Sequence, residues 1–195
     1  VRRAERGGVL IERAAPGEDA AARFYALLEE TSTRNEFAVH QPAYYADLLR
    51  HFGDDALVAF ATVGGHDAVG LIAVRQGAEA VYLYGGSSTQ HRVRGAAQLL
   101  QTDAMRWARD GGCRRYDLWG IPVADPPAKD RAQGQIAPTK GDCWDGLYQF
   151  KTGFGGEIVG YPETLERRYH PLLGFVARRV LPRYRTAPPV PSGRS

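Results

Sequence analysis

Residues 57–84, LVAFATVGGHDAVGLIAVRQGAEAVYLY, contain three short apolar runs separated by two turns. The runs cover residues 57–63, 69–74 and 80–84. Gly64-Gly65-His66-Asp67 and Gln76-Gly77-Ala78-Glu79 lie between them and supply the glycines that tight hairpins favour. The stretch therefore predicts three neighbouring antiparallel strands.

The flanking segments extend these strands into an α/β pattern. Before them, the sequence predicts a strand at 9–13, a helix at 17–31 with apolar residues at helical spacing, and a shorter helix at 43–51 after Pro42. After them, it predicts a long helix at 95–110 that Gly111-Gly112 ends, and a strand at 115–119. A further helix and strand complete the order β, α, α, β, β, β, α, β, α, β. We expect a central, mostly antiparallel mixed sheet flanked by helices.

The composition is that of an ordinary globular domain, because 44% of the 195 residues are hydrophobic and 24% are charged. We expect a single domain over residues 1–185. Residues 123–143 lack a hydrophobic period and predict an inserted loop. Residues 186–195 are rich in proline and predict a disordered tail. Neither a membrane-spanning run nor a signal peptide is evident, so we expect a cytoplasmic protein.

Cysteine and histidine usage predicts no metal site. The two cysteines, Cys113 and Cys143, stand thirty residues apart, and the five histidines show no ligand spacing. Seven arginines and no acidic residue follow Glu166. This basic end could lie on an anionic membrane as an amphipathic helix after Pro171, contact RNA phosphates, or pack on the domain with its arginines in water.

Four segments carry aromatic residues, and three of them also contain glycine. They are Tyr82-Leu83-Tyr84-Gly85-Gly86-Ser87-Ser88, the helix from Leu99-Leu100-Gln101 to Arg106-Trp107-Ala108, Arg115-Tyr116-Asp117-Leu118-Trp119-Gly120-Ile121-Pro122, and Leu147-Tyr148-Gln149-Phe150-Lys151-Thr152-Gly153-Phe154-Gly155-Gly156. In this order they resemble the second half of the Fem (FemABX) family of peptidoglycan-bridge aminoacyltransferases, over residues 4–161. The element order is also that of the Gcn5-related N-acyltransferase (GNAT) fold, which the Fem family uses twice in tandem.

The resemblance implies a function in cell-wall biosynthesis. Fem enzymes move an amino acid from aminoacyl-tRNA to the stem-peptide amine of a peptidoglycan precursor, either UDP-MurNAc-pentapeptide or lipid II, and we expect no other cofactor. Residues 1–9 resemble the junction between the two Fem domains. We therefore expect that a first domain is missing from this chain, and that a partner could supply it.

Lys151 is the candidate catalytic residue. Leu147, Phe150 and Phe154 form one apolar stripe of a predicted helix, and Lys151 lies at the edge of that stripe. One interpretation is a lysine that extends along the apolar surface to water. In the alternative, which the resemblance favours, its ammonium stabilises the oxyanion of acyl transfer. Phe150 is then a wall of the substrate site or a core residue.

Candidate substrate-binding residues come from two other segments. Arg34 matches an arginine that can hold a diphosphate in the Fem family, and a guanidinium pairs bidentately with phosphate; it could instead cap the helix that precedes it. Tyr82 and Tyr84 stand two apart on a predicted strand, so we expect them on one face, with Leu83 on the other. Their hydroxyls could line the acceptor groove beside Ser87 and Ser88, or both rings could be core.

Asp117 and Trp119 are expected to support the site from the next strand, on the same side as Arg115. No residue stands out as a general base, and no nucleophile lies in a readable arrangement with a histidine. Direct attack of the acceptor amine is therefore the expected mechanism.

Two alternative functions remain open. Arg92-Val93-Arg94-Gly95-Ala96-Ala97 fits a loop on which acyl-CoA-dependent relatives hold pyrophosphate at a helix N-terminus. In that case Arg92, Arg94, Gly95 and Ala96 would bind coenzyme A. The other alternative is a non-catalytic domain that binds a cell-wall precursor or RNA.

Overall fold

The computed structural model describes residues 2–121 and 143–160. Most of the predicted insertion at 123–143, the predicted helix after Pro171 and the predicted tail at 186–195 lie outside these residues. The chain divides into two compact units, Val1–Gly156 and Glu157–Ser195. The description below concerns the first unit.

Five strands form one sheet with the order β1-β2-β3-β4-β5. They are β1 (Leu10–Ala14), β2 (Ala56–Val63), β3 (His66–Gln76), β4 (Glu79–Ser87) and β5 (Arg115–Asp117). Strands β1 to β4 pair antiparallel, whereas β5 pairs parallel with β4. The two predicted hairpins and the mixed, mostly antiparallel sheet are thus confirmed.

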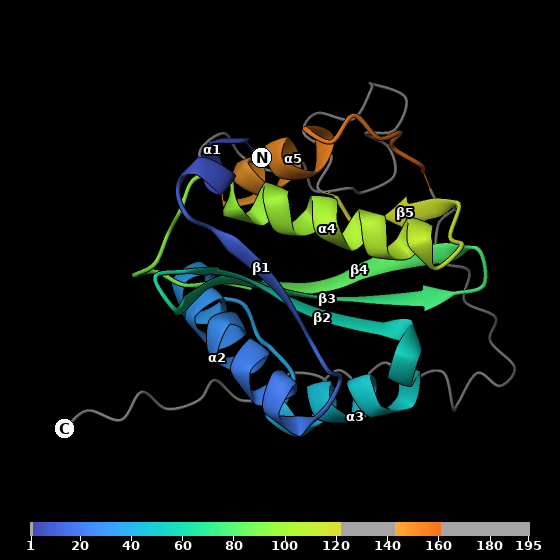
Figure 1. Cartoon of the computed structure of the whole chain (residues 1–195), viewed down its shortest axis with the longest axis horizontal. Coiled ribbons are helices and arrows are strands. Elements are labelled where there is room, and N and C mark those ends of the chain that lie inside the picture. The colour runs from blue at the N-terminus through green and yellow to red at the C-terminus, as the bar shows by residue number, and fades with distance from the viewer. Residues whose placement is uncertain (1, 122–142, 161–195) are drawn as a thin grey trace, which may run out of the picture. The chain divides into compact units, whose positions relative to one another are not determined.

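The helices cover both faces of this sheet (Figure 1). They are α1 (Arg2–Arg6), α2 (Glu18–Asn35), α3 (Pro42–Phe52), α4 (Ala96–Asp110) and α5 (Cys143–Thr152), and a 3-10 turn, η1, covers Gly53–Asp55. Figure 1 shows α2 and α3 against one face, and α4 with α1 and α5 on the other. Each face has its own hydrophobic core.

The α2/α3 face is built from large side chains. Its core contains Phe24, Tyr45, Phe60 and Ile72, all of them fully buried. Gly86 of β4 lets α2 approach closely, because a Cβ atom at this position would lie 2.6 Å from the backbone nitrogen of Leu28. This contact explains the second glycine of the Tyr82–Ser88 segment.

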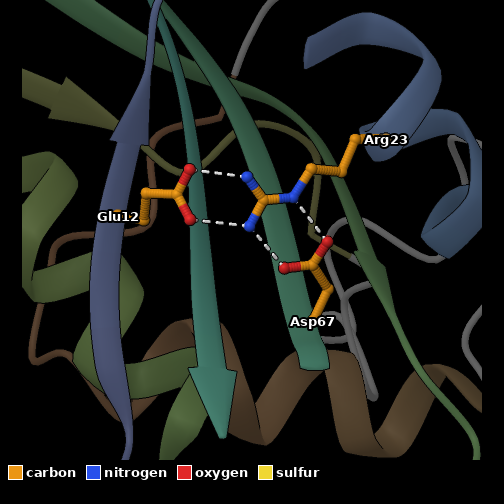
Figure 2. A network of polar contacts seen from close by, with 3 residues as sticks. All are labelled: Glu12, Arg23 and Asp67. Carbon is orange, nitrogen blue, oxygen red and sulfur yellow. Dashed lines mark hydrogen bonds and ion pairs between the residues drawn. The ribbon is translucent and has the colours of Figure 1, made fainter. Parts of the chain in front are cut away.

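An ionic clamp ties α2 to two strands on this same face. The guanidinium of Arg23 donates two hydrogen bonds to Glu12 of β1, at 2.6 and 2.8 Å, and two to Asp67 of β3, both at 2.6 Å (Figure 2). It also lies 3.9 Å from the centroid of the Phe60 ring. Because bidentate arginine–carboxylate pairs fix geometry, the clamp sets the position of α2 on the sheet.

The α4 face is built from small side chains. Six of the eleven fully packed core residues on this face are alanines, and they lie with Val9, Leu57, Leu71, Leu99 and Leu100. The alanines lie at positions 4, 59, 61, 73, 96 and 104. Small side chains let α4 lie close to the sheet. Larger groups gather around this core instead, among them Tyr82, Trp107 and Tyr116.

Several elements differ from the sequence prediction; β5, for example, ends at Asp117 rather than at residue 119. Helix α1 was not predicted, and α2 runs four residues beyond the predicted end at Thr31. The Thr31 hydroxyl bonds to the Leu27 carbonyl inside the helix, and Glu36 ends the helix in a left-handed conformation with φ 55°. Arg34 consequently lies in the last turn of α2 rather than after it.

Candidate functional site

Lys151 is buried near the end of α5, with only 7% of its surface exposed. Its Nζ donates a hydrogen bond to the Gly120 carbonyl at 2.6 Å. Burial lowers the pKa of the Lys151 amine, and the negative charge of Asp117 opposes this shift. The interpretation in which Lys151 extends to water is therefore wrong, because the amine ends against backbone inside the protein.

The Lys151 amine also lies 5.8 Å from the centroid of the Tyr82 ring. Tyr82 belongs to the α4-side core, whereas Leu83 and Tyr84 pack on the α2/α3-side core. The prediction that Tyr82 and Tyr84 share a face, with Leu83 on the other, is therefore wrong. The reason is a β-bulge: Ala73 pairs with Tyr82 and Ile72 with Tyr84, so Leu83 is an extra residue that shifts the alternation.

Gln101 and Tyr116 form the remaining polar pair of this cluster, and sequence reasoning did not single out either of them. The Tyr116 hydroxyl donates to Gln101 Oε1 at 2.8 Å, and Gln101 is 2% exposed. Burial, and then the nearby Tyr82, raise the pKa of Tyr116. A signal was present, because Gln101 stands on the helical stripe of Ala104 and Ala108, where a polar side chain needs a buried partner.

The cluster borders an open part of β4. Strand β5 pairs with β4 only at Glu79, Ala80 and Val81. From Tyr82 to Ser87, β4 has no strand partner on the β5 side among the described residues. Backbone N–H groups along such an edge can donate to a ligand, which is an arrangement suited to acyl-group binding.

Tyr84 lies on the opposite face in an aromatic group with Tyr44 and Tyr45. The Tyr44 and Tyr84 hydroxyls are 3.0 Å apart, and the two rings meet edge to face at 89°. Desolvation, and then the bond to Tyr44, raise the pKa of Tyr84. The Tyr84 hydroxyl therefore already has a protein partner.

Arg34 bonds within the protein to the last residue of β4 and to the loop that follows it. Its guanidinium donates to Ser87 Oγ at 2.9 Å, to the Ser87 carbonyl at 3.3 Å and to Thr89 Oγ1 at 2.8 Å. A hollow of about 460 Å³ beside it is lined by Glu29, Glu30, Thr33, Arg34 and Thr89. Glu30 accepts hydrogen bonds from the Thr89 N–H and the Ser88 hydroxyl. Phosphate binding by Arg34 stays a prediction, as does the place of Ser87 in an acceptor groove.

The supporting residues lie at the end of β5. Asp117 accepts a hydrogen bond from the Trp119 N–H at 2.7 Å, and Trp119 adopts a left-handed conformation with φ 63°. Strand β5 ends at Asp117, so the alternation of side chains along a strand does not extend to Trp119. It therefore does not place Trp119 on the same side as Arg115 and Asp117. Trp119 is 59% exposed.

Phe150 packs edge to face against Phe154, with ring centroids 5.4 Å apart.

The loop of the coenzyme A alternative precedes α4. Gly95 is the N-cap of α4 with φ 91°, and no side chain caps the helix. Arg92 and Arg94 are exposed. Helix N-termini attract negative charge, but the Ala96 N–H here donates to the Val93 carbonyl at 3.1 Å, so coenzyme A binding by this loop stays a prediction.

Within residues 2–121 and 143–160, no group of three metal-binding side chains comes together. None of the helices in this part of the chain combines the length and apolar character that a membrane crossing requires.

Solved structures similar to this chain include FemX, AAC(6')-Iy and a ribosomal-protein-alanine N-acetyltransferase. FemX superposes with a TM-score of 0.62 at 18% identity, over 79% of this chain and 52% of FemX. AAC(6')-Iy, solved with a bisubstrate analogue of coenzyme A and acetylneamine, gives a TM-score of 0.53 at 13% identity over 82% and 98%. The ribosomal-protein-alanine N-acetyltransferase of Brucella melitensis biovar Abortus 2308 gives 0.52 at 16% over 83% and 99%.

At these identities the likeness shows the fold alone. This chain spans about half the length of FemX and nearly the whole of the two acetyltransferases. Among curated protein sequences, none matches it significantly. A sequence model of the acetyltransferase (GNAT) domain matches residues 1–129, about two thirds of the chain. The chain therefore belongs to the GNAT acyltransferase family.

Proposed function

We propose that this acyltransferase moves an aminoacyl group from aminoacyl-tRNA to the stem-peptide amine of a peptidoglycan precursor. The observation that supports the proposal is the convergence of all four Fem-like segments on one cluster. Tyr82, Gln101, Tyr116, Gly120 and Lys151 each come from one of these segments, and they meet through the contacts described above. Such convergence is expected of segments that serve one site.

Lys151 is proposed to stabilise the oxyanion of the transfer. Its bond to the Gly120 carbonyl holds Nζ in place. An ammonium has three protons, so two remain for a ligand. In a site from which water is excluded, a fixed cation acts more strongly on developing charge than it does in solvent. The acceptor amine attacks the ester directly, and its proton passes to water or to the substrate.

The acceptor is proposed to be a precursor whose diphosphate carries either a nucleotide or a lipid. A further domain, in the same polypeptide or in a partner, is proposed to complete its cleft, as in Fem proteins. Since Arg34 already has acceptors in Ser87 and Thr89, a phosphate would have to compete with them.

Acyl-CoA-dependent transfer is the second candidate. The observation in its favour is the α4 N-terminus, where Gly95 takes a left-handed conformation and no side chain caps the helix. A pyrophosphate could accept the N–H groups of that first turn.

One assay separates the two donors. The full-length protein is incubated with labelled aminoacyl-tRNA and precursor, with and without ribonuclease, and with acetyl-CoA as competitor. Ribonuclease should abolish product, and acetyl-CoA should neither bind nor compete.

The matched variants are Gly95→Glu and Gly77→Glu. Both replace a glycine of positive φ, but Gly77 lies in a hairpin turn with no atom near its Cβ position. Acetyl-CoA binding that is lost in Gly95→Glu and kept in Gly77→Glu would favour acyl-CoA and contradict the tRNA proposal.

A further inference from the structure

The Tyr82 hydroxyl differs from the other polar groups of the cluster. The Tyr116 hydroxyl bonds to Gln101 and the Lys151 amine bonds to Gly120. In the part of the chain that the structure describes, no protein group forms a hydrogen bond with the Tyr82 hydroxyl. Tyr82 is partly exposed, and its hydroxyl, unlike Arg75 Nε, is not a fully buried polar atom without a partner, so a ligand can reach it and accept a hydrogen bond from it.

Gly85 explains where this hydroxyl lies. A Cβ atom at Gly85 would lie only 1.8 Å from Tyr82 Oη and 2.9 Å from Tyr82 Cζ. The ring therefore extends along β4 and ends directly over the Gly85 backbone. Because β5 pairs with β4 no further than Val81, the hydroxyl ends over the half of β4 that is open on the β5 side. The first glycine of the Tyr82–Ser88 segment is thus needed for the position of Tyr82.

The protonation state of Tyr82 suits a hydrogen-bond donor. Burial raises the pKa of Tyr82 to about 12, so the hydroxyl keeps its proton at neutral pH. The Lys151 amine lies 5.8 Å from the centroid of the Tyr82 ring, so a cation lies near the same side chain. An oxygen that gains negative charge there would meet a neutral donor and a cation together.

We infer that the Tyr82 hydroxyl is a catalytic hydrogen-bond donor to the carbonyl oxygen of the acyl donor. The inference rests on the proposed acyl transfer at this cluster, and it holds whether the donor is an ester or a thioester. In the step, the acceptor nitrogen forms a bond to the carbonyl carbon, and the carbonyl π electrons move onto the oxygen that Tyr82 contacts. As they return, the bond to the leaving oxygen or sulfur breaks. The amine proton passes to water, the leaving group takes a proton from water, and Tyr82 keeps its own.

The test compares two tyrosines of one cluster in the full-length protein. Tyr82→Phe removes the unpartnered hydroxyl, and Tyr116→Phe removes the hydroxyl that Gln101 binds. Tyr82→Phe should lower kcat about a hundredfold, the scale of one lost oxyanion donor, with KM for both substrates unchanged and the melting temperature not lowered. Tyr116→Phe, which breaks a hydrogen bond that is already made within the protein, should lower the melting temperature and should lower kcat less than Tyr82→Phe does. Wild-type kcat in Tyr82→Phe would overturn the inference.

Gly85→Ala provides a second, independent variant. Its methyl group would occupy the place of the Tyr82 hydroxyl, so it should lower kcat in the wild-type background. In the Tyr82→Phe background it should lower kcat little further, because the two changes remove the same contact. Full additivity of the two losses would contradict the inference.

Both donors are assayed in parallel, so the inference and the proposed function can fail separately. If acetyl-CoA supports turnover and aminoacyl-tRNA does not, the proposed function fails, while a loss of kcat in Tyr82→Phe with acetyl-CoA still supports the inference. If aminoacyl-tRNA is the donor and Tyr82→Phe is fully active, only the inference fails. A wild-type protein that turns over neither donor contradicts both.

Discussion

The two faces of the sheet use polar groups in opposite ways. On the α2/α3 face, polar side chains form hydrogen bonds with one another. Arg23 binds two carboxylates, Arg34 binds Ser87, and Tyr44 binds Tyr84. On the α4 face, an alanine-rich core lies beside a buried amine and a hydroxyl that has no protein partner within residues 2–121 and 143–160. The first arrangement stabilises the fold. The second keeps donors available for a ligand.

The strongest test of this contrast is Lys151→Met. Activity should fall about a hundredfold or more, because one fixed donor to the oxyanion is lost. The melting temperature should not fall, since a methionine of similar length replaces a desolvated amine. Arg109→Met, which removes an exposed cation from the end of α4, is the control and should keep activity. A Lys151→Met protein that melts well below the wild type would mean that this face, too, is built for stability.

The comparison of the wild type with Lys151→Met also tests how the free energy of unfolding depends on pH. Burial lowers the pKa of Lys151 below its ordinary value of 10.5. Between the folded and the unfolded pKa, the unfolded state binds more protons, so wild-type stability should rise with pH through that range. Chemical denaturation from pH 7 to 10 measures the effect as a difference between the wild type and Lys151→Met. A difference that stays constant over this range would contradict the pKa shift.

Gly86→Ala tests the opposite face. Its Cβ would lie 2.6 Å from the Leu28 nitrogen and 2.7 Å from the Leu27 carbonyl carbon. Backbone cannot give way as a side chain can, so the substitution should cost about 3 kcal/mol in the free energy of unfolding. Gly17→Ala, where no atom lies near the new Cβ, is the control. Folded Gly86→Ala protein should lose less kcat than Lys151→Met, because the new methyl group would meet the α2 backbone rather than the Lys151 cluster.

The sequence predicted the strands and helices well because those signals are local. Glycine turns marked both hairpins, and an apolar stripe marked α4. The bulge at Leu83 was missed because alternation along one strand assumes unbroken pairing with the next strand, and the shift depends on β3. Gln101 and Tyr116 stand fifteen residues apart, so their hydrogen bond depends on how α4 packs beside β5. Lys151 was identified from a motif, but only the fold shows that it is buried.

Arg23→Met should have a smaller effect on stability than Gly86→Ala. The variant leaves the Glu12 and Asp67 carboxylates without their shared partner. Since Glu12 is half exposed, water replaces part of the loss, and we expect a cost of about 2 kcal/mol in the free energy of unfolding at pH 7. Arg50→Met, which breaks an exposed pair with Asp47 on α3, is the control and should cost less than about 0.5 kcal/mol.

The cost of Arg23→Met should also depend on pH. The hydrogen bond from Arg23 holds the pKa of Glu12 below its ordinary value of 4.5. The stabilisation is therefore present above pH 4.5 and is lost as the pH falls through the folded pKa. Urea denaturation of the wild type and of Arg23→Met between pH 7 and 3 should show the two curves converging in acid. Parallel curves would contradict an ionic clamp.

The smallest effect concerns Arg34, whose role decides how much of the α2/α3 face serves the substrate. Ser87→Ala removes one acceptor of its guanidinium and should cost about 1 kcal/mol in the free energy of unfolding. Arg34→Lys should cost a similar amount, and the double variant should cost less than the sum, because both changes break one contact. KM for the precursor should stay near the wild-type value in all three. If KM rises in Arg34→Lys while Ser87→Ala leaves it unchanged, the guanidinium binds the precursor diphosphate, and this face then contributes to recognition as well as to stability.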